Sequence, residues 1–158
     1  MSVQYALVGG LALSPYKVVR ATQDIDLLVD RAVADALHDE VTRLGYTCLH
    51  RSGEVANYQR QDERLDFLFA HRPAAKKLLS NAKEVDSSFG AVRVVSGEGL
   101  IALKLQGAVN DPRRTQDLED IKALLRANRD TLKMAEVREY FKLFERESLL
   151  DELIKQID

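Results

Sequence analysis

Two aspartates open an apolar run near the N-terminus of the chain. Asp24 and Asp26 are separated by one residue, and the run continues to Val29. On a β-strand, alternate side chains point to the same face, so both carboxylates would face one way. Two unit charges about 6 Å apart repel by about 3 kcal/mol at an effective dielectric constant of about 20. We therefore expect this pair either in water or around a shared cation.

A third aspartate interrupts a second apolar run. Asp66 lies within the segment from Leu65 to Phe69, whose other residues are all apolar. A charge in such a run is costly to bury unless it is paired or bound to a metal. Carboxylates on neighbouring strands are the hard oxygen ligands that Mg²⁺ prefers, and Mg²⁺ is usually held by a few carboxylates together with substrate phosphates. Asp24, Asp26 and Asp66 thus predict a Mg²⁺ site that binds a nucleoside triphosphate.

A glycine pair precedes these carboxylates in a position suited to phosphate. Gly9 and Gly10 follow a short predicted strand and precede a short helix that begins at Leu11. Glycine lets the backbone approach a ligand closely, and a helix N-terminus offers N–H groups to phosphate. Arg20 adds a guanidinium just before the carboxylate pair. Gly9, Gly10 and Arg20 are therefore expected to contact phosphates.

Each of these residues also has a simpler interpretation. Most Asp-x-Asp pairs lie at solvated strand ends, and most Gly-Gly pairs are plain turns. Lys104 shares a predicted helix face with apolar residues, where its stem would lie on the core while its amine reaches outward. Asp117 falls in the first turn of a predicted helix, where an acidic side chain interacts favourably with the helix dipole. These alternatives are open at the level of the sequence.

Hydrophobic periodicity predicts an α/β fold, a mixed sheet followed by a helical C-terminal half. The expected strands cover residues 3–8, 24–29, 46–50, 55–60 and 65–69, with a hairpin over 85–95 around Phe89-Gly90. The expected helices cover residues 31–44, a segment that begins at Pro73, and residues 99–109, 116–127, 135–144 and 148–157. We expect a single domain over 1–158, with a mixed core over about 1–95 and a helical part over about 96–158.

Four segments, in order, resemble a known superfamily. Residues 7–13 with 20–29 look like the first motif of DNA polymerase β-like nucleotidyltransferases, and they are most similar to the minimal nucleotidyltransferases of the AbiEii toxin type, which includes the MenT toxins. Asp66 sits where the superfamily has its third carboxylate. Residues 96–105 resemble the family's acidic-then-lysine helix, and residues 114–121 resemble its basic-then-Asp-x-x-Asp segment.

The resemblance implies transfer of a nucleoside monophosphate from a nucleoside triphosphate to an acceptor. Asp24 and Asp26 would hold two Mg²⁺ ions, or Mn²⁺, and Asp66 would complete the metal nearer the acceptor. Lys104 would offset charge that builds on the pyrophosphate. The remaining residues implied in nucleotide binding are Thr22, Arg114 and Asp117. The acceptor implied by the toxin type is tRNA, with an antitoxin as a partner; a protein or a small molecule such as an aminoglycoside is the alternative.

Composition narrows the class of protein. The net charge is -2, which does not favour a nucleic-acid binder by bulk charge. No apolar run approaches the roughly 20 residues that span a membrane, and the single cysteine, Cys48, fits a reducing cytoplasm. Two other classes stay open: a nucleotide-binding regulatory module without turnover, and an α+β interaction domain whose carboxylates are only surface charges.

Overall fold

The chain forms two compact units in the computed structural model, which describes residues 2–19, 22–87 and 90–158. The first unit, here the sheet unit, comprises Met1–Ala12 and Arg20–Ser96. The second, the helical unit, comprises Leu13–Val19 and Gly97–Asp158. The short segment Leu13–Val19 therefore belongs to the helical unit, although both of its flanks belong to the sheet unit.

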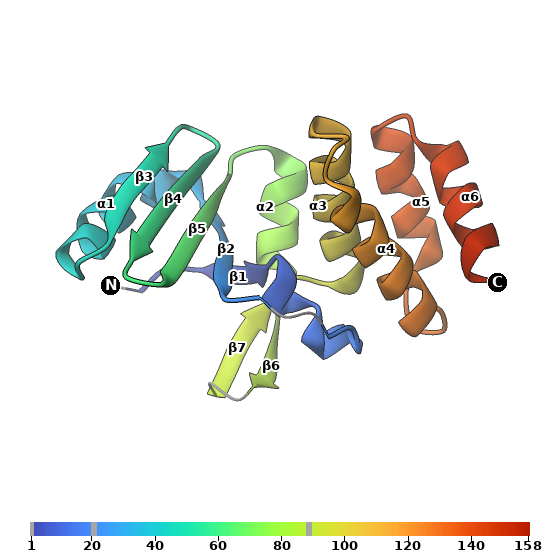
Figure 1. Ribbon diagram of the computed structural model, residues 1–158, viewed down its shortest axis with the longest axis horizontal. Coiled ribbons are helices and arrows are strands. Elements are labelled where there is room, and N and C mark those ends of the chain that lie inside the picture. Colours follow the sequence, from blue (N-terminus) through green and yellow to red (C-terminus); the bar gives the residue numbers. More distant parts are fainter. Residues whose placement is uncertain (1, 20–21, 88–89) are drawn as a thin grey trace. The chain divides into compact units, whose positions relative to one another are not determined.

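A mixed β-sheet forms the centre of the sheet unit (Figure 1). Within the described residues it has seven strands in the order β3-β4-β5-β2-β1-β7-β6. The pairs β2–β5 and β1–β7 are parallel, and the other neighbours are antiparallel. The strands are β1 (Tyr5–Val8), β2 (Asp24–Asp30), β3 (Thr47–Arg51), β4 (Val55–Arg60), β5 (Glu63–Ala70), β6 (Lys83–Ser87) and β7 (Gly90–Val94). The predicted α/β fold with a mixed sheet is confirmed.

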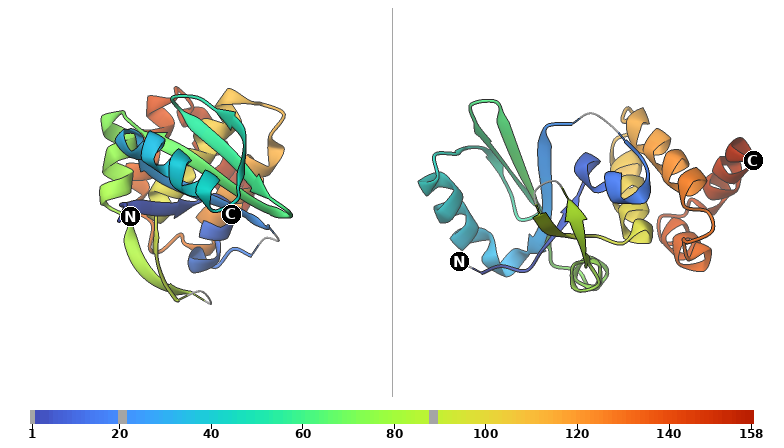
Figure 2. Two further views of the ribbon diagram at one scale, coloured as in Figure 1. Left: turned by 90° about the vertical axis from the view of Figure 1, so that its left-hand side faces the viewer. Right: turned by 90° about the horizontal axis from the view of Figure 1, so that it is seen from below.

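One face of the sheet packs against helix α1 (Ala34–Arg43), as Figures 1 and 2 show. The helix ends at Arg43, and Gly45 follows two residues later with a φ of 96°, as a glycine after a helix C-terminus commonly does. The core on this face combines Val41 of α1 with residues of β2, β4 and β5, namely Val29, Ala56, Tyr58, Phe67 and Phe69. Since side chains alternate along a strand, the even-numbered residues of β2 and β5 point to the opposite face.

The second helix of this unit, α2 (Pro73–Ser80), begins with proline in the first turn, where its missing N–H costs nothing. Lys76 of α2 lies 3.8 Å from Asp30, the last residue of β2. Asp30 is even-numbered, so α2 lies toward the C-terminal end of the face that also carries Asp24 and Asp26. The polar residues described below lie toward the N-terminal ends of β2 and β5 on that face.

The helical unit contains α3 (Gly97–Asn110), α4 (Thr115–Ala127), α5 (Met134–Leu143) and α6 (Glu147–Ile157), with a short 3-10 turn at Ser14–Tyr16. Its buried apolar side chains come from all of these helices, including Leu105, Ile121, Leu124, Phe141 and Leu150. Asn128 Nδ2 donates a 2.7 Å hydrogen bond to the backbone carbonyl of Tyr16, which ties the short segment to the helices. Over the described residues, no helix combines the length and the apolarity that crossing a membrane would need.

Candidate functional site

The structure places the three predicted carboxylates on one face of the sheet. Asp26 on β2 and Asp66 on β5 are direct partners in the parallel β2–β5 register. Asp24 lies two residues before Asp26, so its side chain shares that face. Asp24 is exposed, and Asp26 and Asp66 are half-buried. The two half-buried acids thus lie side by side on adjacent strands, with the third at the exposed end.

Two side chains hold one oxygen of Asp66. Asn57 on β4 is the register partner of Asp66, and its Nδ2 donates a 2.7 Å hydrogen bond to Asp66 Oδ1. Arg64, two residues earlier on β5, donates from Nε to the same oxygen at 3.1 Å. Both donors hold Oδ1, so the orientation of the Asp66 carboxylate is fixed by side chains of two strands.

Gly9 lies directly against Asp26. It follows β1, whose last residue, Val8, is the register partner of Asp26. The φ of Gly9 is 71°, and a Cβ built there would come within 2.1 Å of Asp26 Oδ2. Only glycine combines this conformation with this close approach. The Gly9 turn is therefore built to admit the Asp26 carboxylate.

Three other residues of the sheet unit were predicted to bind the nucleotide, namely Gly10, Thr22 and Arg20. Gly10 is buried and begins the short 3-10 helix Gly10–Ala12. Thr22 Oγ1 accepts a 3.3 Å hydrogen bond from the backbone N–H of Asp24, so Thr22 fixes the entry to β2. Arg20 lies outside the described residues, and its predicted phosphate contact stays a prediction.

The carboxylates suit a divalent cation that prefers hard oxygen ligands. Among the residues that the structure describes, no three His, Cys, Asp or Glu side chains are close enough to hold a metal ion by themselves. Mg²⁺ usually takes only one or two carboxylates and completes its shell with waters and substrate phosphates. Asp26, which lies against the Gly9 turn, and Asp66, its register partner on the neighbouring strand, match that partial donor set. The residues present therefore suit an ion that arrives with a triphosphate.

Lys104, Arg114 and Asp117 are brought together in the helical unit. Lys104 on α3 is only 7% exposed, and its Nζ lies 2.8 Å from Asp120 Oδ2 and 3.8 Å from Asp117 Oδ1. Asp120 is held further by Gln116, whose Nε2 donates to its Oδ1 at 2.8 Å. The lysine therefore bridges α3 to two buried carboxylates of α4, and it does not reach outward as a snorkelling residue would.

Arg114 completes this buried cluster from its edge. Its Nε lies 3.1 Å from Asp117 Oδ2, while most of its side chain is exposed. Gly107 makes room for the cluster, because a Cβ at that position would come within 2.7 Å of Asp117 Oδ2. These contacts explain why Asp117 tolerates burial. The prediction that Lys104, Arg114 and Asp117 contact a nucleotide stays a prediction.

Glu98, in the acidic part of the motif-like segment 96–105, has a structural contact. Its Oε1 accepts a 2.8 Å hydrogen bond from the backbone N–H of Lys133, immediately before α5. An acid at that position satisfies one of the N–H groups that a helix start leaves without a partner.

Glu98 also affects Tyr16. The pKa of Tyr16 is raised to about 12, mainly by burial and to a smaller extent by the negative charge of Glu98.

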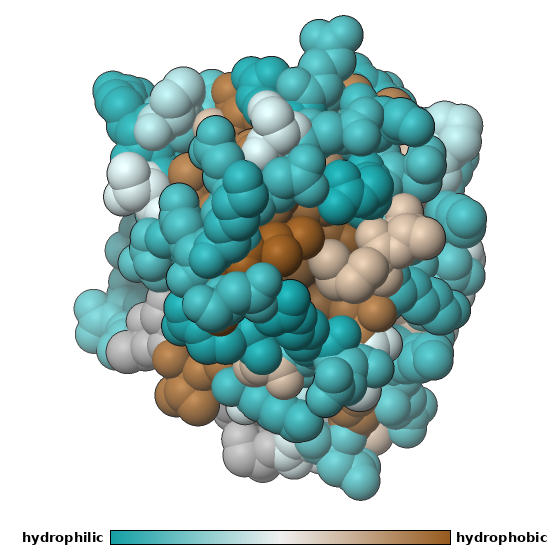
Figure 3. Space-filling view, turned by 90° about the vertical axis from the view of Figure 1, so that its right-hand side faces the viewer, coloured by the Kyte–Doolittle hydropathy of each residue, from teal (hydrophilic) through white to brown (hydrophobic). Residues whose placement is uncertain are grey.

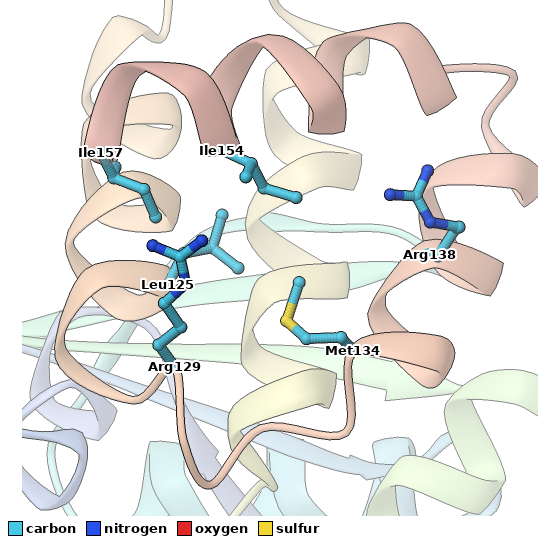
Figure 4. A pocket seen from close by; sticks show the side chains of 6 residues that line it. All are labelled: Leu125, Arg129, Met134, Arg138, Ile154 and Ile157. Carbon is cyan, nitrogen blue, oxygen red and sulfur yellow. The ribbon is translucent and has the colours of Figure 1, made fainter.

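A pocket of about 200 Å³ lies within the helical unit. Figure 3 shows apolar surface framed by hydrophilic side chains when the molecule is viewed from the side of the C-terminal helices. In Figure 4 the pocket is lined by Leu125, Met134, Ile154 and Ile157, with Arg129 next to Leu125 and Arg138 at the other side. Both arginines are ion-paired, with Asp158 and Asp151 respectively. The pocket therefore lacks the open positive charge that a triphosphate requires, and it contains none of the predicted site residues.

The fold of this chain is similar to that of solved nucleotidyltransferase structures. The antibiotic-resistance factor ANT(2'')-Ia has a TM-score of 0.64 and 20% identity over 98% of this chain and 89% of its own. The lincosamide antibiotic adenylyltransferase LnuA has a TM-score of 0.56 and 18% identity over 77% of this chain and 85% of its own. An antigenic nucleotidyltransferase-like protein from Paracoccidioides brasiliensis has a TM-score of 0.55 and 16% identity over 97% of this chain and 84% of its own. No protein-family model and no curated protein matches the sequence.

Asn57, Arg64, Asp120 and Gln116 were not predicted as site residues. Asn57 and Arg64 alternate with apolar residues on their strands, which is also how solvent-facing residues behave. Only the register of β4, β5 and β2 reveals that they lie next to Asp66 and Asp24. That register depends on turn geometry and on packing against α1 across several strands, so no single motif in the sequence specifies it.

A Gly9→Ala substitution is expected to weaken nucleotide binding in Mg²⁺ at least about tenfold, because the new methyl group displaces the Asp26 carboxylate. It also places a Cβ in the left-handed region, which costs about 1–2 kcal/mol. Gly45→Ala separates the two effects: its φ is 96°, but its Cβ would meet only Arg60 Cδ, at 3.5 Å. Titration calorimetry with a non-hydrolysable nucleotide should show a loss for Gly9→Ala alone. Equal loss in both folded variants would contradict a specific role for Gly9.

Proposed function

We propose that this protein transfers a nucleoside monophosphate from a nucleoside triphosphate to a hydroxyl acceptor and releases pyrophosphate. The observation that supports this most directly is the register pairing of Asp26 and Asp66 beside the Gly9 turn, on a nucleotidyltransferase fold. Asp24 lies on the same face, and Asp24, Asp26 and Asp66 together form the carboxylate row. Carboxylates of this kind together with phosphate oxygens form the usual environment of a catalytic Mg²⁺.

In this reaction the acceptor oxygen bonds to the α-phosphorus, and the bond from that phosphorus to the pyrophosphate oxygen breaks. Asp24 and Asp26 would hold the metal that accompanies the triphosphate. Asp66 would lie beside the acceptor, where it would complete the second metal and take the hydroxyl proton. Two bound Mg²⁺ ions would supply stabilisation of the attacking and leaving oxygens. Backbone N–H groups at Gly9 and Gly10 would bind phosphate oxygens, as turns of this type often do.

For the acceptor, we favour a small hydroxylated molecule such as an aminoglycoside. ANT(2'')-Ia, whose structure holds adenylyl-2''-tobramycin in one form, covers 90% of this chain and is itself 87% covered, so the two chains are of similar extent. The net charge of -2 also suits a cationic small molecule better than a polyanion.

The second candidate acceptor is tRNA, in a toxin of the AbiEii or MenT type with an antitoxin partner. The four segments that resemble this type, which occur in the same order along the chain, favour tRNA as the acceptor. The basic residues that would contact RNA are Arg113, Arg114 and Lys122. Each is already paired with a nearby acid, namely Asp111, Asp117 and Glu119 in turn. Three locally neutralised cations make a weak basic face, and RNA affinity depends on such a face.

The two acceptors can be separated in one assay. The protein is incubated with each α-labelled nucleoside triphosphate and Mg²⁺, and with either a panel of aminoglycosides or total tRNA. We expect label in the small-molecule fraction, and none with Asp26→Asn. Label in tRNA would favour the toxin type, and label in neither would contradict both acceptors.

Nucleotide binding is expected to raise the melting temperature in a manner that depends on Mg²⁺. A ligand at 100 times its Kd adds about 2.7 kcal/mol to the free energy of unfolding. Thermal melts with each nucleoside triphosphate, with and without Mg²⁺, measure this directly, and Asp26→Asn is the control. A shift without turnover would favour the regulatory module that binds nucleotide without transferring it. The absence of a shift with every nucleotide would favour a plain interaction domain.

A further inference from the structure

Arg64 lies beside two of the predicted site carboxylates, Asp66 and Asp24. Its Nε lies 3.1 Å from Asp66 Oδ1, and its backbone is the direct register partner of Asp24 across β2 and β5. Residues 64 and 66 share a face, as do residues 24 and 26. A guanidinium group thus occupies the same side of the sheet as all three acids, next to the pair that the proposed function assigns to metal.

A guanidinium group in this position carries a charge that the protein cannot remove. The guanidinium group of arginine carries a positive charge in proteins. It therefore offsets the mutual repulsion of Asp24, Asp26 and Asp66 when they hold no cation. The same charge opposes a divalent cation that approaches Asp66, because like charges repel most strongly where water is partly excluded. The side chain is 39% exposed, so this opposition is screened but not abolished.

Asn57 and Arg64 hold the same oxygen with different consequences. Asn57 is neutral, and its 2.7 Å hydrogen bond to Oδ1 does not compete with a cation. Arg64 is charged, and a guanidinium group binds phosphate oxygens as readily as carboxylate oxygens. A triphosphate would offer the guanidinium an alternative partner, while Asn57 would still donate its hydrogen bond to Asp66 Oδ1.

We infer that Arg64 is an internal counter-ion that couples metal binding to nucleotide binding. In the free protein it holds Asp66 and weakens metal affinity. With a triphosphate bound, it exchanges the Asp66 carboxylate for a phosphate oxygen and so leaves Asp66 to the metal. This inference rests on the proposed function. Its consequence is that metal binds weakly alone and more tightly with nucleotide, a reciprocal coupling between two ligands.

The test measures Mn²⁺ binding by electron paramagnetic resonance, without nucleotide and with a non-hydrolysable triphosphate. Arg64→Gln is expected to bind Mn²⁺ alone about threefold more tightly than the wild type, the scale of a half-exposed ion pair. The ratio of the two affinities, with and without nucleotide, should fall by a similar factor. Arg60→Gln is the matched control, because Arg60 is 41% exposed and pairs with Glu63, outside the carboxylate row.

The outcomes separate this inference from the proposed function. If Asp26→Asn loses the Mn²⁺ site while Arg64→Gln and wild type bind equally, the metal site stands and the role of Arg64 is overturned. Weaker Mn²⁺ binding by Arg64→Gln also overturns it, since a positioning role alone would give that result. If Asp26→Asn binds Mn²⁺ like the wild type, the metal lies elsewhere, and both the proposed site and the inference fail.

Discussion

Asp66→Asn is expected to reduce nucleotidyl transfer by at least about 10²-fold, the lower range for one acid–base contribution. Nucleotide affinity should stay within about tenfold, or 1.4 kcal/mol. The reason is the position of Asp66 on β5, across from Asp26 and away from the Gly9 turn. The proposed function places the triphosphate metal on β2 and the acceptor beside β5. Single-turnover rates and calorimetric affinities measure the two effects separately.

Asp24→Asn provides the comparison, because it should damage both nucleotide affinity and transfer.

The Asp66→Asn variant should stay folded. Asparagine is nearly isosteric with aspartate, so Asn57 should keep its hydrogen bond to the side-chain oxygen at position 66. A circular dichroism melt checks this. Transfer at the wild-type rate by a folded Asp66→Asn variant would show that Asp66 is a tolerated strand residue and would overturn the site assignment.

Lys104→Met is expected to lower the free energy of unfolding by about 3–5 kcal/mol, the usual cost of removing one partner of a buried ion pair. Asp120 and Asp117 are each 3% exposed and would lose the ammonium group that they share. Methionine retains the length of the stem, so the loss is electrostatic. Urea unfolding followed by far-ultraviolet circular dichroism gives the change in free energy.

Lys122→Met is the matched control in the same unit. Lys122 pairs at 2.9 Å with Glu119, which is 62% exposed, so its removal should cost less than about 1 kcal/mol. The Lys104 variant also tests the role that the sequence predicts for this lysine. A variant with unchanged stability but a large loss of nucleotide affinity would show that Lys104 serves the triphosphate, and that its ion pairs contribute little to the fold.

The period of the strands made the carboxylate row predictable. Asp24 and Asp26, separated by one residue in an apolar run, had to share a face, and that face is the one opposite α1. Asp66, a charged residue in an otherwise apolar strand, indicated a third member of the same site. Helices with clear start and stop signals, such as the one that begins at Pro73 and the one that ends before Gly45, were equally accessible from sequence.

Contacts that depend on register or on burial were not predictable. Arg64 lies beside Asp24 only because β2 and β5 run parallel in one particular register. The simpler interpretation of Lys104 was a side chain that extends outward from its helix, as a lysine next to apolar residues usually does. Asp117 and Asp120 override that tendency by supplying buried acceptors, and no local pattern reveals that two helices meet there.

The assignment of Leu13–Val19 to the helical unit has a consequence for modularity. The polypeptide passes between its two units three times: after Ala12, after Val19 and after Ser96. A fragment that begins at Gly97 would lack the Tyr16 carbonyl that Asn128 binds, and it would also lack the fully buried Leu13. Neither unit is therefore a cassette that recombination could exchange in a single piece. A chimaera that swaps the helices must carry two separate stretches of sequence, one of them only seven residues from Leu13 to Val19.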